Sequence, residues 1–212
     1  MKVLLLGATG GTGLHAAEAA LAAGHTLTVV LRNPKKLPES IAARCASIIR
    51  ADATNPASMA SAVTGQEAIL IVLGSQGLFS RQYDCSKGTA NIIKALASAP
   101  EPKPRLVVCS SMGASESRAW LPGFVLWMLK HPLADKDDQE RDVRASGLPF
   151  VIVRPTGLND GKARGPDAVV RVVGGPLPHN QIARADVGAF LVAALASDEY
   201  LGKAVGISWR GP

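Results

Sequence analysis

The stretch "LLLGATGGTGLH", residues 4–15, decides the fold of this 212-residue chain. It places Gly7, Gly10 and Gly13 three residues apart, between an apolar run and an alanine-rich stretch. A turn of this kind, after a strand and at the start of a helix, can bind a pyrophosphate. Gly7 allows the tight bend, Gly10 allows the ligand to approach, and Gly13 allows the helix to pack on the strand. We predict a dinucleotide site here, against the alternative of a glycine-rich loop without a ligand.

Apolar runs alternate with helix-like stretches along most of the chain. The predicted strands cover residues 2–7, 25–32, 46–52, 67–74, 104–111, 149–155 and 203–209. The predicted helices cover residues 13–24, 57–65, 83–99, 136–147 and 185–197. Because the strands are continuously apolar and alternate with helices, they indicate a parallel sheet covered on both faces.

We therefore predict an α/β fold with a doubly wound parallel sheet, the Rossmann fold, as a single domain over residues 1–212. A small C-terminal lobe on the substrate side is expected, with segments 113–135 and 158–182 near the substrate. The Gly- and Pro-rich stretch 161–178 predicts loops, and the charged run 135–142 predicts a solvent-exposed helix face. Asp186 is expected as a helix N-cap.

Composition and charge exclude several classes of protein. Hydrophobic residues make up 47% of the chain and charged residues 19%, which is an ordinary globular balance. The net charge of +6 is scattered, so it predicts an anionic small ligand and no nucleic acid. The first apolar run is too short for a signal peptide or a membrane span, which predicts a cytoplasmic protein without membrane contact. Cys45, Cys85 and Cys109 lie far apart, and no residues have metal-ligand spacing.

The end of the second strand selects the cofactor. NAD-binding proteins place an acid there for the ribose 2′-hydroxyl, whereas this strand ends in Arg32, with Lys36 close behind. A guanidinium suits a 2′-phosphate, so we predict NADP(H); the alternative is that Arg32 is only a solvated strand end. Since ligands bind at the carboxyl ends of parallel strands, the third and fourth strands add Asp52, Ala53, Leu73, Gly74 and Ser75 to the cofactor site.

A Tyr-x-x-x-Lys pair after the fifth strand, as used by many short-chain reductases, is missing. Tyr83 and Lys87 have the spacing, but they precede that strand and its Ser110 and Ser111. Either the protein binds a nucleotide without turnover, or it passes hydride to an acceptor that needs no tyrosine. Flavins are such acceptors, because their electron-poor ring takes hydride directly.

Several stretches together resemble the atypical short-chain dehydrogenase/reductases. They are "GATGGTGLH" (7–15), "VVLRNPKKLP" (29–38), "LVVCSSMG" (106–113), "ASGLPFVIVRPTGLNDG" (145–161) and "ARADVGAFLVAALASDEY" (183–200). The resemblance runs over nearly the whole chain. It points to the group of NADPH-dependent flavin reductases and biliverdin-IXβ reductases, with NmrA-like neighbours.

The resemblance implies a role for each matching position. For the 2′-phosphate it implies Arg32 and Lys36, and for the pyrophosphate turn Thr9, Gly11 and Thr12. Beside the nicotinamide it implies Cys109, Ser110 and Ser111, with Ser111 able to assist the acceptor. The loop over the nicotinamide matches Pro155, Thr156, Gly157 and Leu158. Lys136 stands where the flavin reductases have a histidine and many atypical relatives have a lysine, which makes it the second catalytic candidate.

The acceptor itself is the least certain inference, because segment 115–135 matches the group poorly. Trp120 and Phe124 are expected to stack on a planar ring; their spacing equally fits a buried helix face or a subunit contact. Phe79 is a further candidate for the acceptor wall. The leading hypothesis is hydride transfer from NADPH to FMN, riboflavin or a tetrapyrrole-like acceptor, by a monomer or weak homodimer. The alternatives are an NmrA-like NADP(H) sensor without turnover and an atypical epimerase or dehydratase.

Overall fold

A central sheet of eight strands forms the middle of the protein, in the order β3-β2-β1-β4-β5-β6-β10-β8. The computed structural model describes residues 1–74 and 83–211. The strands are β1 (Lys2–Leu6), β2 (Thr26–Leu31), β3 (Ser47–Arg50), β4 (Ala68–Ile71), β5 (Arg105–Cys109), β6 (Phe150–Pro155), β8 (Val169–Val172) and β10 (Ala204–Trp209). All neighbouring pairs are parallel except β10 with β8. The predicted doubly wound parallel sheet is confirmed.

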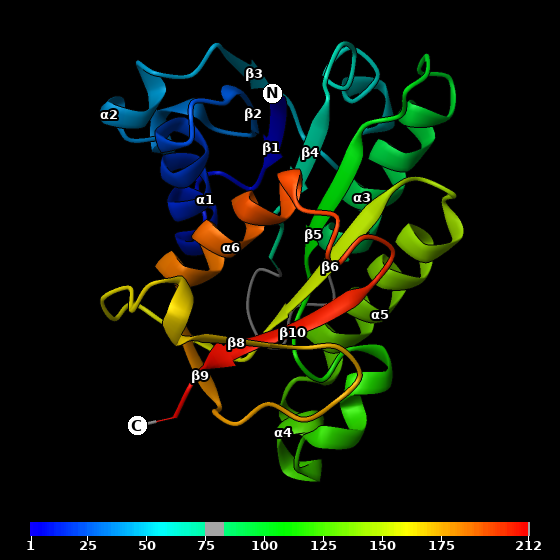
Figure 1. Cartoon of the computed structure of the whole chain (residues 1–212). Coiled ribbons are helices and arrows are strands. Elements are labelled where there is room, and N and C mark those ends of the chain that lie inside the picture. Colours follow the sequence, from blue (N-terminus) through cyan, green and yellow to red (C-terminus); the bar gives the residue numbers. More distant parts are fainter. Residues whose placement is uncertain (75–82, 212) are drawn as a thin grey trace.

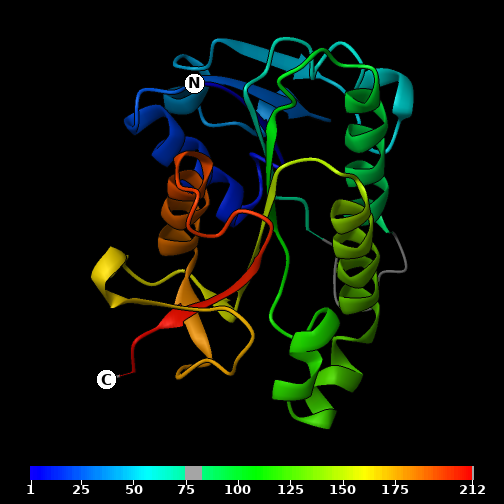
Figure 2. The ribbon, with the colours of Figure 1, turned by 45° about the vertical axis from the view of Figure 1, so that its right-hand side comes forward.

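Helices cover both faces of this sheet (Figures 1 and 2). On one face α1 (Gly11–Ala22) packs on α6 (Arg184–Ala196), and on the other α3 (Asp84–Ala97) packs on α5 (Lys130–Ala145). Shorter elements connect them: α2 (Glu39–Ala42), α4 (Gly123–Met128), η1 (Pro34–Lys36), η2 (Pro56–Ser58), η3 (Ser115–Trp120) and η4 (Pro166–Ala168). A separate parallel pair is formed by β7 (Gly157–Asn159) and β9 (Gln181–Ala183).

The β1 strand shows why continuous apolar runs produce this arrangement. Successive side chains point to opposite faces of a strand, so both sets must be apolar when both faces are covered. Val3 and Leu5 belong to the core beneath α1 and α6. Leu4 and Leu6 belong to the core beneath α3 and α5. The glycine turn follows directly, at the edge of the sheet where the strand order reverses between β1 and β4.

Two expected elements differ from the structure. The predicted helix over 57–65 is wrong, because only the 3₁₀ turn η2 forms at its start. Stretch 161–178 is not all loop, since β8 lies within it and extends the main sheet as its antiparallel edge strand. The short apolar run that forms β8 lies next to glycines and prolines, and its sequence does not show that it pairs with β10.

The charged run 135–142 is a solvent-exposed face only in part, because half of its residues are buried. Asp135, Lys136, Gln139 and Glu140 are all buried, and the two carboxylate oxygens of Asp135 accept hydrogen bonds from the first turn of α3, at the backbone N–H groups of residues 85 and 86. Only the opposite side of the helix carries exposed pairs, such as that between Arg141 and its neighbours. Within the described chain, no helix is both long and apolar enough to cross a lipid bilayer.

Asp186 is also placed differently from the prediction. It is the third residue of α6 rather than its N-cap, and it is buried. Its carboxylate accepts the indole N–H of Trp209 at 2.8 Å and the backbone N–H groups of Arg164 and Gly165. Asp186 therefore fixes the loop before η4 and the end of β10 to the start of α6.

Candidate functional site

The glycine turn joins β1 to α1 in a conformation that only glycines allow. Gly7 has a φ of +88°, and a Cβ there would lie 2.3 Å from the backbone oxygen of Val72. A Cβ on Gly13 would lie 2.0 Å from the Gly7 oxygen. At Gly10 the nearest atom would be 3.5 Å away, an ordinary contact. The first and third glycines thus close the turn, while the second leaves room in front of it.

The N-terminus of α1 offers an anion site at this turn. Its N-cap is Gly10, which has no side chain to cap the helix, and the first turn contains no acidic residue. Uncapped N–H groups and the positive end of the helix dipole favour a phosphate there. The turn residues Gly10, Gly11, Thr12 and Gly13 all line a pocket in front of the helix. The residues present therefore fit a dinucleotide pyrophosphate.

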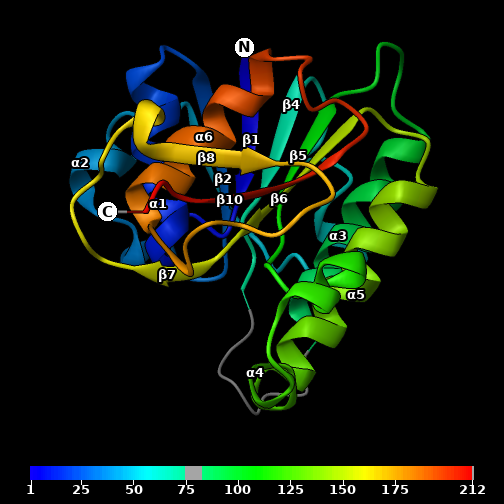
Figure 3. The same ribbon diagram turned by 60° about the horizontal axis from the view of Figure 1, so that its bottom comes forward.

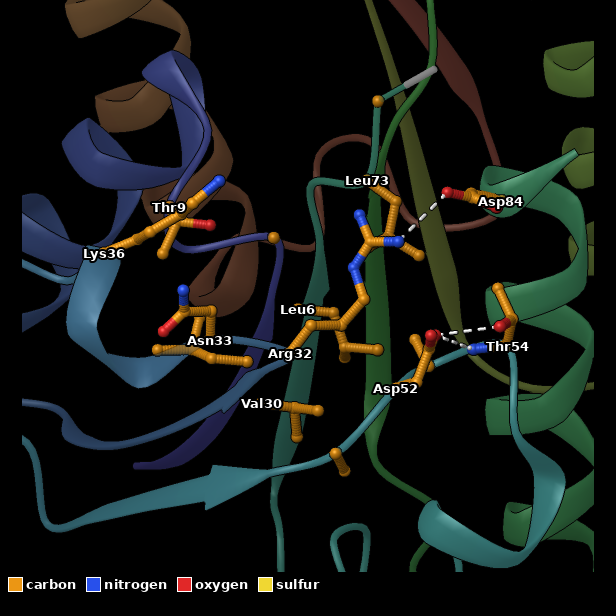
Figure 4. A pocket seen from close by; sticks show the side chains of 15 residues that line it. Leu6, Thr9, Val30, Arg32, Asn33, Lys36, Asp52, Thr54, Leu73 and Asp84 are labelled. Atoms are coloured by element: carbon orange, nitrogen blue, oxygen red, sulfur yellow. Dashed lines mark hydrogen bonds and ion pairs between the residues drawn. The ribbon is translucent and has the colours of Figure 1, made fainter. Parts of the chain in front are cut away.

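A first pocket lies beside the end of β2 and is lined by Arg32 and Lys36, the residues predicted for a 2′-phosphate (Figure 4). Arg32 crosses this pocket: its Nη1 lies 3.6 Å from Oδ2 of Asp84, and its side chain is 58% exposed. Figure 4 shows the guanidinium turned toward Asp84 and away from Asn33 and Lys36. A phosphate bound here would compete with Asp84 for the guanidinium.

Lys36 reaches the same pocket through the capped turn η1. The Asn33 side chain accepts a hydrogen bond from the backbone N–H of Lys35 at 3.1 Å, and the Asn33 carbonyl accepts one from Lys36. This local capping forms the 3₁₀ turn and places Lys36, but not Lys35, among the residues that line the pocket. Arg32 and Lys36 therefore line the same pocket at the end of β2, although the guanidinium is turned away from Lys36, and their role toward a 2′-phosphate stays a prediction.

Asp52 and Ala53 follow β3 and line the opposite wall of the pocket. The Asp52 Oδ1 accepts hydrogen bonds from the backbone N–H and the hydroxyl of Thr54, at 2.9 and 2.8 Å. The backbone hydrogen bond from Thr54 lowers the pKa of Asp52; burial opposes this, and the Thr54 hydroxyl and the Arg32 charge add to it. Asp52 is therefore a carboxylate near neutral pH. The Ala53 carbonyl accepts from Asn91, which joins this wall to α3.

A second, larger pocket of about 540 Å³ opens in front of α1, which is the size of sites that bind ring compounds. Leu73 and Gly74, at the end of β4, line both pockets. The two pockets therefore meet at one turn, as a single elongated ligand requires. Ser75 and Phe79, which were predicted for the cofactor and the acceptor, lie outside the described residues. The second pocket is lined by residues 10–13, 72–74, 109–111, 129, 132, 133, 136, 158 and 184.

Lys136 projects from α5 to the floor of the second pocket and is only 8% exposed. Its Nζ donates to the backbone oxygens of Leu73 at 2.9 Å and Cys109 at 2.7 Å, and to Oε1 of Gln139 at 3.0 Å. An ammonium has three donors, so all three are used. The Gln139 amide is itself fixed by Thr89 at 2.8 Å. Lys136 holds the ends of β4 and β5 together, which fits a positioning role better than proton donation to a substrate.

The two serines after β5 differ in their environments. Ser110 is buried, and its hydroxyl donates to Oε1 of Glu140 at 2.5 Å. Ser111 is half-buried, and its hydroxyl donates to the backbone oxygen of Met112 at 3.1 Å. Both residues line the second pocket, as does Cys109. Because the Ser110 donor is taken by a buried carboxylate, Ser111 is the serine that a bound acceptor could use.

A buried ionic cluster anchors this side of the site. Arg154, on β6, is 3% exposed; it donates from Nε to Glu140 at 2.9 Å and from both terminal nitrogens to Glu116 at 2.9 Å. Burial disfavours the charge on Arg154, but the hydrogen bonds that it donates to Glu140 and Glu116 outweigh this effect and raise the pKa of Arg154. The hydrogen bond from Arg154 lowers the pKa of Glu116 to about 2. The cluster fixes η3, which carries Glu116, to β6 and α5.

The loop after β6 is held by backbone hydrogen bonds. The Pro155 oxygen accepts from Met112 at 2.9 Å, the Thr156 N–H donates to the oxygen of residue 207 at 3.1 Å, and the Gly157 N–H donates to that of residue 180 at 2.9 Å. Of the four predicted loop residues, only Leu158 lines the second pocket. In this structure the loop is pinned beside the sheet, and a role of the other three toward the nicotinamide stays a prediction.

The predicted aromatic wall is not formed by the side chains that were expected to provide it. Trp120 ends η3 and is half-buried, while Phe124, on α4, is 72% exposed; neither lines the second pocket. The apolar wall comes instead from Leu129, Leu133 and Leu158, with a proline between the first two. Figure 3 shows why: α4 extends away from the carboxyl edge of the sheet, and only the start of α5 returns to it.

Arg184 lines the second pocket although nothing in the sequence singled it out. It opens α6, more than 170 residues after the glycine turn, and the packing of α6 on α1 brings it there. Asp84 was missed for a similar reason, since it faces Arg32 from a different element. Over residues 1–74 and 83–211, no group of three or more His, Cys, Asp or Glu side chains could hold a metal ion.

Comparisons with known proteins agree with this geometry. A family model described as NAD(P)H-binding matches residues 7–198. Reductase pytE of Aspergillus terreus is 30% identical, over 98% of this chain and 97% of that protein. ChuY, an anaerobillin reductase from Escherichia coli O157:H7, has a TM-score of 0.83 at 22% identity and covers 98% of this chain and 96% of its own. A short-chain dehydrogenase/reductase from Veillonella parvula, solved in complex with NADP, has a TM-score of 0.79 at 21% identity, covering 99% and 95%. At these identities the two solved structures show a shared fold.

Proposed function

Because this chain belongs to the NAD(P)H-binding family, we propose that it is an oxidoreductase that passes hydride from NADPH to a planar acceptor such as FMN, riboflavin or a tetrapyrrole. One observation carries the proposal: two pockets of different character meet at Leu73 and Gly74. The first contains cations suited to a 2′-phosphate, and the second is wide and has an apolar wall. The named reductases among its relatives, one of which acts on anaerobillin, support a reductase with a planar substrate.

The preference for NADPH over NADH rests on the end of β2. Arg32 and Lys36 line the first pocket, and no acid follows the strand in the place where a ribose 2′-hydroxyl would be bound. A guanidinium can give a phosphate two parallel hydrogen bonds, and an ammonium adds a second charge. The turn at Gly10 and the uncapped start of α1 would hold the pyrophosphate in the second pocket, which these residues line.

The acceptor is inferred from what the second pocket offers. A bound NADPH supplies the hydride, so the chain must bind the acceptor, orient it and exclude water. In the described part of the chain, no tyrosine or histidine lines this pocket. Leu129, Leu133 and Leu158 form an apolar wall for a ring, and Ser111 can hydrogen-bond to its polar edge. An electron-poor ring that needs no phenolic acid fits this set of groups.

The test is to follow loss of the reduced nicotinamide absorbance with NADPH and NADH in parallel, with and without FMN or biliverdin. We expect acceptor-dependent oxidation of NADPH that is faster than that of NADH. Ser111→Ala should lower the turnover number only modestly, because the acceptor ring takes hydride directly and the protein mainly supplies its orientation. Tight NADPH binding without turnover on flavins, bilins or quinones would favour an NADP(H) sensor instead. The cytoplasmic location, the absence of nucleic-acid and membrane partners, and the monomeric or weakly dimeric state remain predictions.

A further inference from the structure

We propose that Arg184 is a ligand of the cofactor pyrophosphate, supplied to the glycine turn by the distant helix α6. The proposal rests on the NADP(H) binding proposed above and adds a charged residue to that site. The sequence placed only neutral groups at the turn, namely backbone N–H groups and threonine hydroxyls.

The side chain of Arg184 lies directly over the turn. A Cβ built on Gly11 would lie 2.8 Å from Cδ of Arg184 and 3.1 Å from its Nε. Arg184 lines the same pocket as Gly10, Gly11 and Thr12, which carry the N–H groups at the start of α1. Gly11 therefore has a second role: the absence of its side chain makes room for the arginine.

The packing of the two helices fixes this position. A Cβ on Gly188 of α6 would lie 2.7 Å from the backbone nitrogen of Ala16 and 2.8 Å from the Cβ of His15, both on α1. The helices therefore approach each other backbone to backbone, as Figures 1 and 2 show for the blue and orange helices. The contact at Gly188 lies about one helical turn after Arg184 on α6 and about one turn after Gly11 on α1. It therefore fixes the distance between the first turns of the two helices, which carry Arg184 and Gly11.

The Arg184 guanidinium is ion-paired within the protein, and most of its N–H donors stay available to a ligand. Nη1 of Arg184 donates to Oδ1 of Asp160 at 2.7 Å, while the Arg184 side chain is 28% exposed and that of Asp160 is 84% exposed. In the described chain this is the one hydrogen bond of a group that has five donors. A pair with so exposed an acid is weak, so a phosphate can share or take the guanidinium.

Charge balance supports the assignment. A dinucleotide pyrophosphate carries two negative charges, and few of the described side chains that line the second pocket are basic and could neutralise them. Among the described residues that line the second pocket, two have basic side chains, Lys136 and Arg184. All three N–H donors of Lys136 form hydrogen bonds to protein oxygens. Arg184 is then the cation that can meet the pyrophosphate.

The experiment compares two ligands on four proteins. Dissociation constants for NADPH and for 2′-AMP are measured with the wild type, Arg184→Gln, Arg184→Lys and the control Arg141→Gln. Arg141 is an exposed, ion-paired arginine on α5 that lines neither pocket. The ligand 2′-AMP has the 2′-phosphate but no pyrophosphate, so it reports on the Arg32 end alone.

We expect Arg184→Gln to weaken NADPH about tenfold or more, since charge-assisted hydrogen bonds to a phosphate are lost. The same variant should leave 2′-AMP within about twofold of the wild type, Arg184→Lys should retain part of the NADPH affinity, and Arg141→Gln should bind both ligands normally. If Arg184→Gln binds NADPH as tightly as the wild type or more tightly, or loses both ligands equally, the proposal is wrong. A wild-type protein that does not bind NADPH would instead overturn the proposed function. Because Arg184→Lys keeps the charge and most of the side chain, it keeps the comparison available if Arg184→Gln folds poorly.

Discussion

Replacing Arg32 with alanine tests the cofactor preference at its source. The guanidinium lies in the first pocket, paired to Asp84 at 3.6 Å with more than half of its side chain exposed. If it binds the 2′-phosphate, the variant should lose affinity for NADPH and keep its affinity for NADH, which lacks that phosphate.

The size of the effect follows from two opposing contributions. Hydrogen bonds between charged groups contribute about 1.5–3 kcal/mol. Releasing Arg32 from an exposed ion pair with Asp84 costs about 0–1 kcal/mol, which must be subtracted. The net loss is about 0.5–3 kcal/mol, or about a 2- to 140-fold rise in the Kd for NADPH.

Titration calorimetry with NADPH and NADH on the same preparation measures both constants. Two neighbouring lysines give a matched control, because Lys36 lines the pocket and Lys35 does not. Lys36→Ala should weaken NADPH selectively, and Lys35→Ala should change neither constant. If Arg32→Ala weakens NADPH and NADH equally, the arginine contributes through the adenine or through folding, and its assignment to the 2′-phosphate is wrong.

Three further predictions concern stability. Gly13→Ala should destabilise the protein by about 3 kcal/mol or more in urea unfolding, because its Cβ would meet a backbone oxygen at 2.0 Å, whereas Gly10→Ala should fold normally. Glu140→Gln should cost about 1.5–3 kcal/mol, because, of its charged partners in the described chain, the buried Arg154 would keep only Glu116. Joint replacement of Glu140 and Arg154 by apolar residues should recover part of this loss, and no recovery would argue against the ion pair as its cause. The pKa of Glu116 is about 2 in the folded protein, below its ordinary value of 4.5. Its contribution to the free energy of unfolding is therefore fully present above pH 4.5 and is lost as the pH falls toward 2. As the pH is lowered over this range, the free energy of unfolding should fall less steeply in Glu116→Gln than in the wild type. Identical slopes in the two proteins would contradict the lowered pKa of Glu116.

Buried charges mark the limit of what could be predicted from the sequence. The run 135–142 has the composition of a solvated helix, and half of it is. The other half enters the site: Lys136 joins the ends of β4 and β5, and Glu140 joins Ser110 to Arg154. Helical periodicity shows which residues share a face, but which face is buried depends on the elements that pack against it.

The residues that line the second pocket, where the acceptor is proposed to bind, could not be predicted from the sequence for a related reason. Trp120 and Phe124 were expected in its wall because of their ring chemistry, yet α4 carries Phe124 away from the carboxyl edge of the sheet. The wall comes from Leu129, Leu133 and Leu158, which have no chemical signature in a sequence. Leu129 and Leu133 come to the pocket at the start of α5, whereas Leu158 comes from β7, so the wall depends on how these distant elements pack.

The parallel doubly wound sheet, the NAD(P)H-binding family and the positions of Gly7, Gly13 and Arg32 could all be predicted from the amino-acid sequence. Each of these depends on residues close together in the chain: a strand, a turn and a helix, or a strand and the residue that ends it. The folded arrangement was needed to show that Lys136 donates all its hydrogen bonds to protein oxygens, and that Arg184 lies over the glycine turn. Apart from the hydrogen bond between Lys136 and Gln139, those contacts join residues tens to more than a hundred positions apart, and helix packing, which local sequence does not encode, sets them.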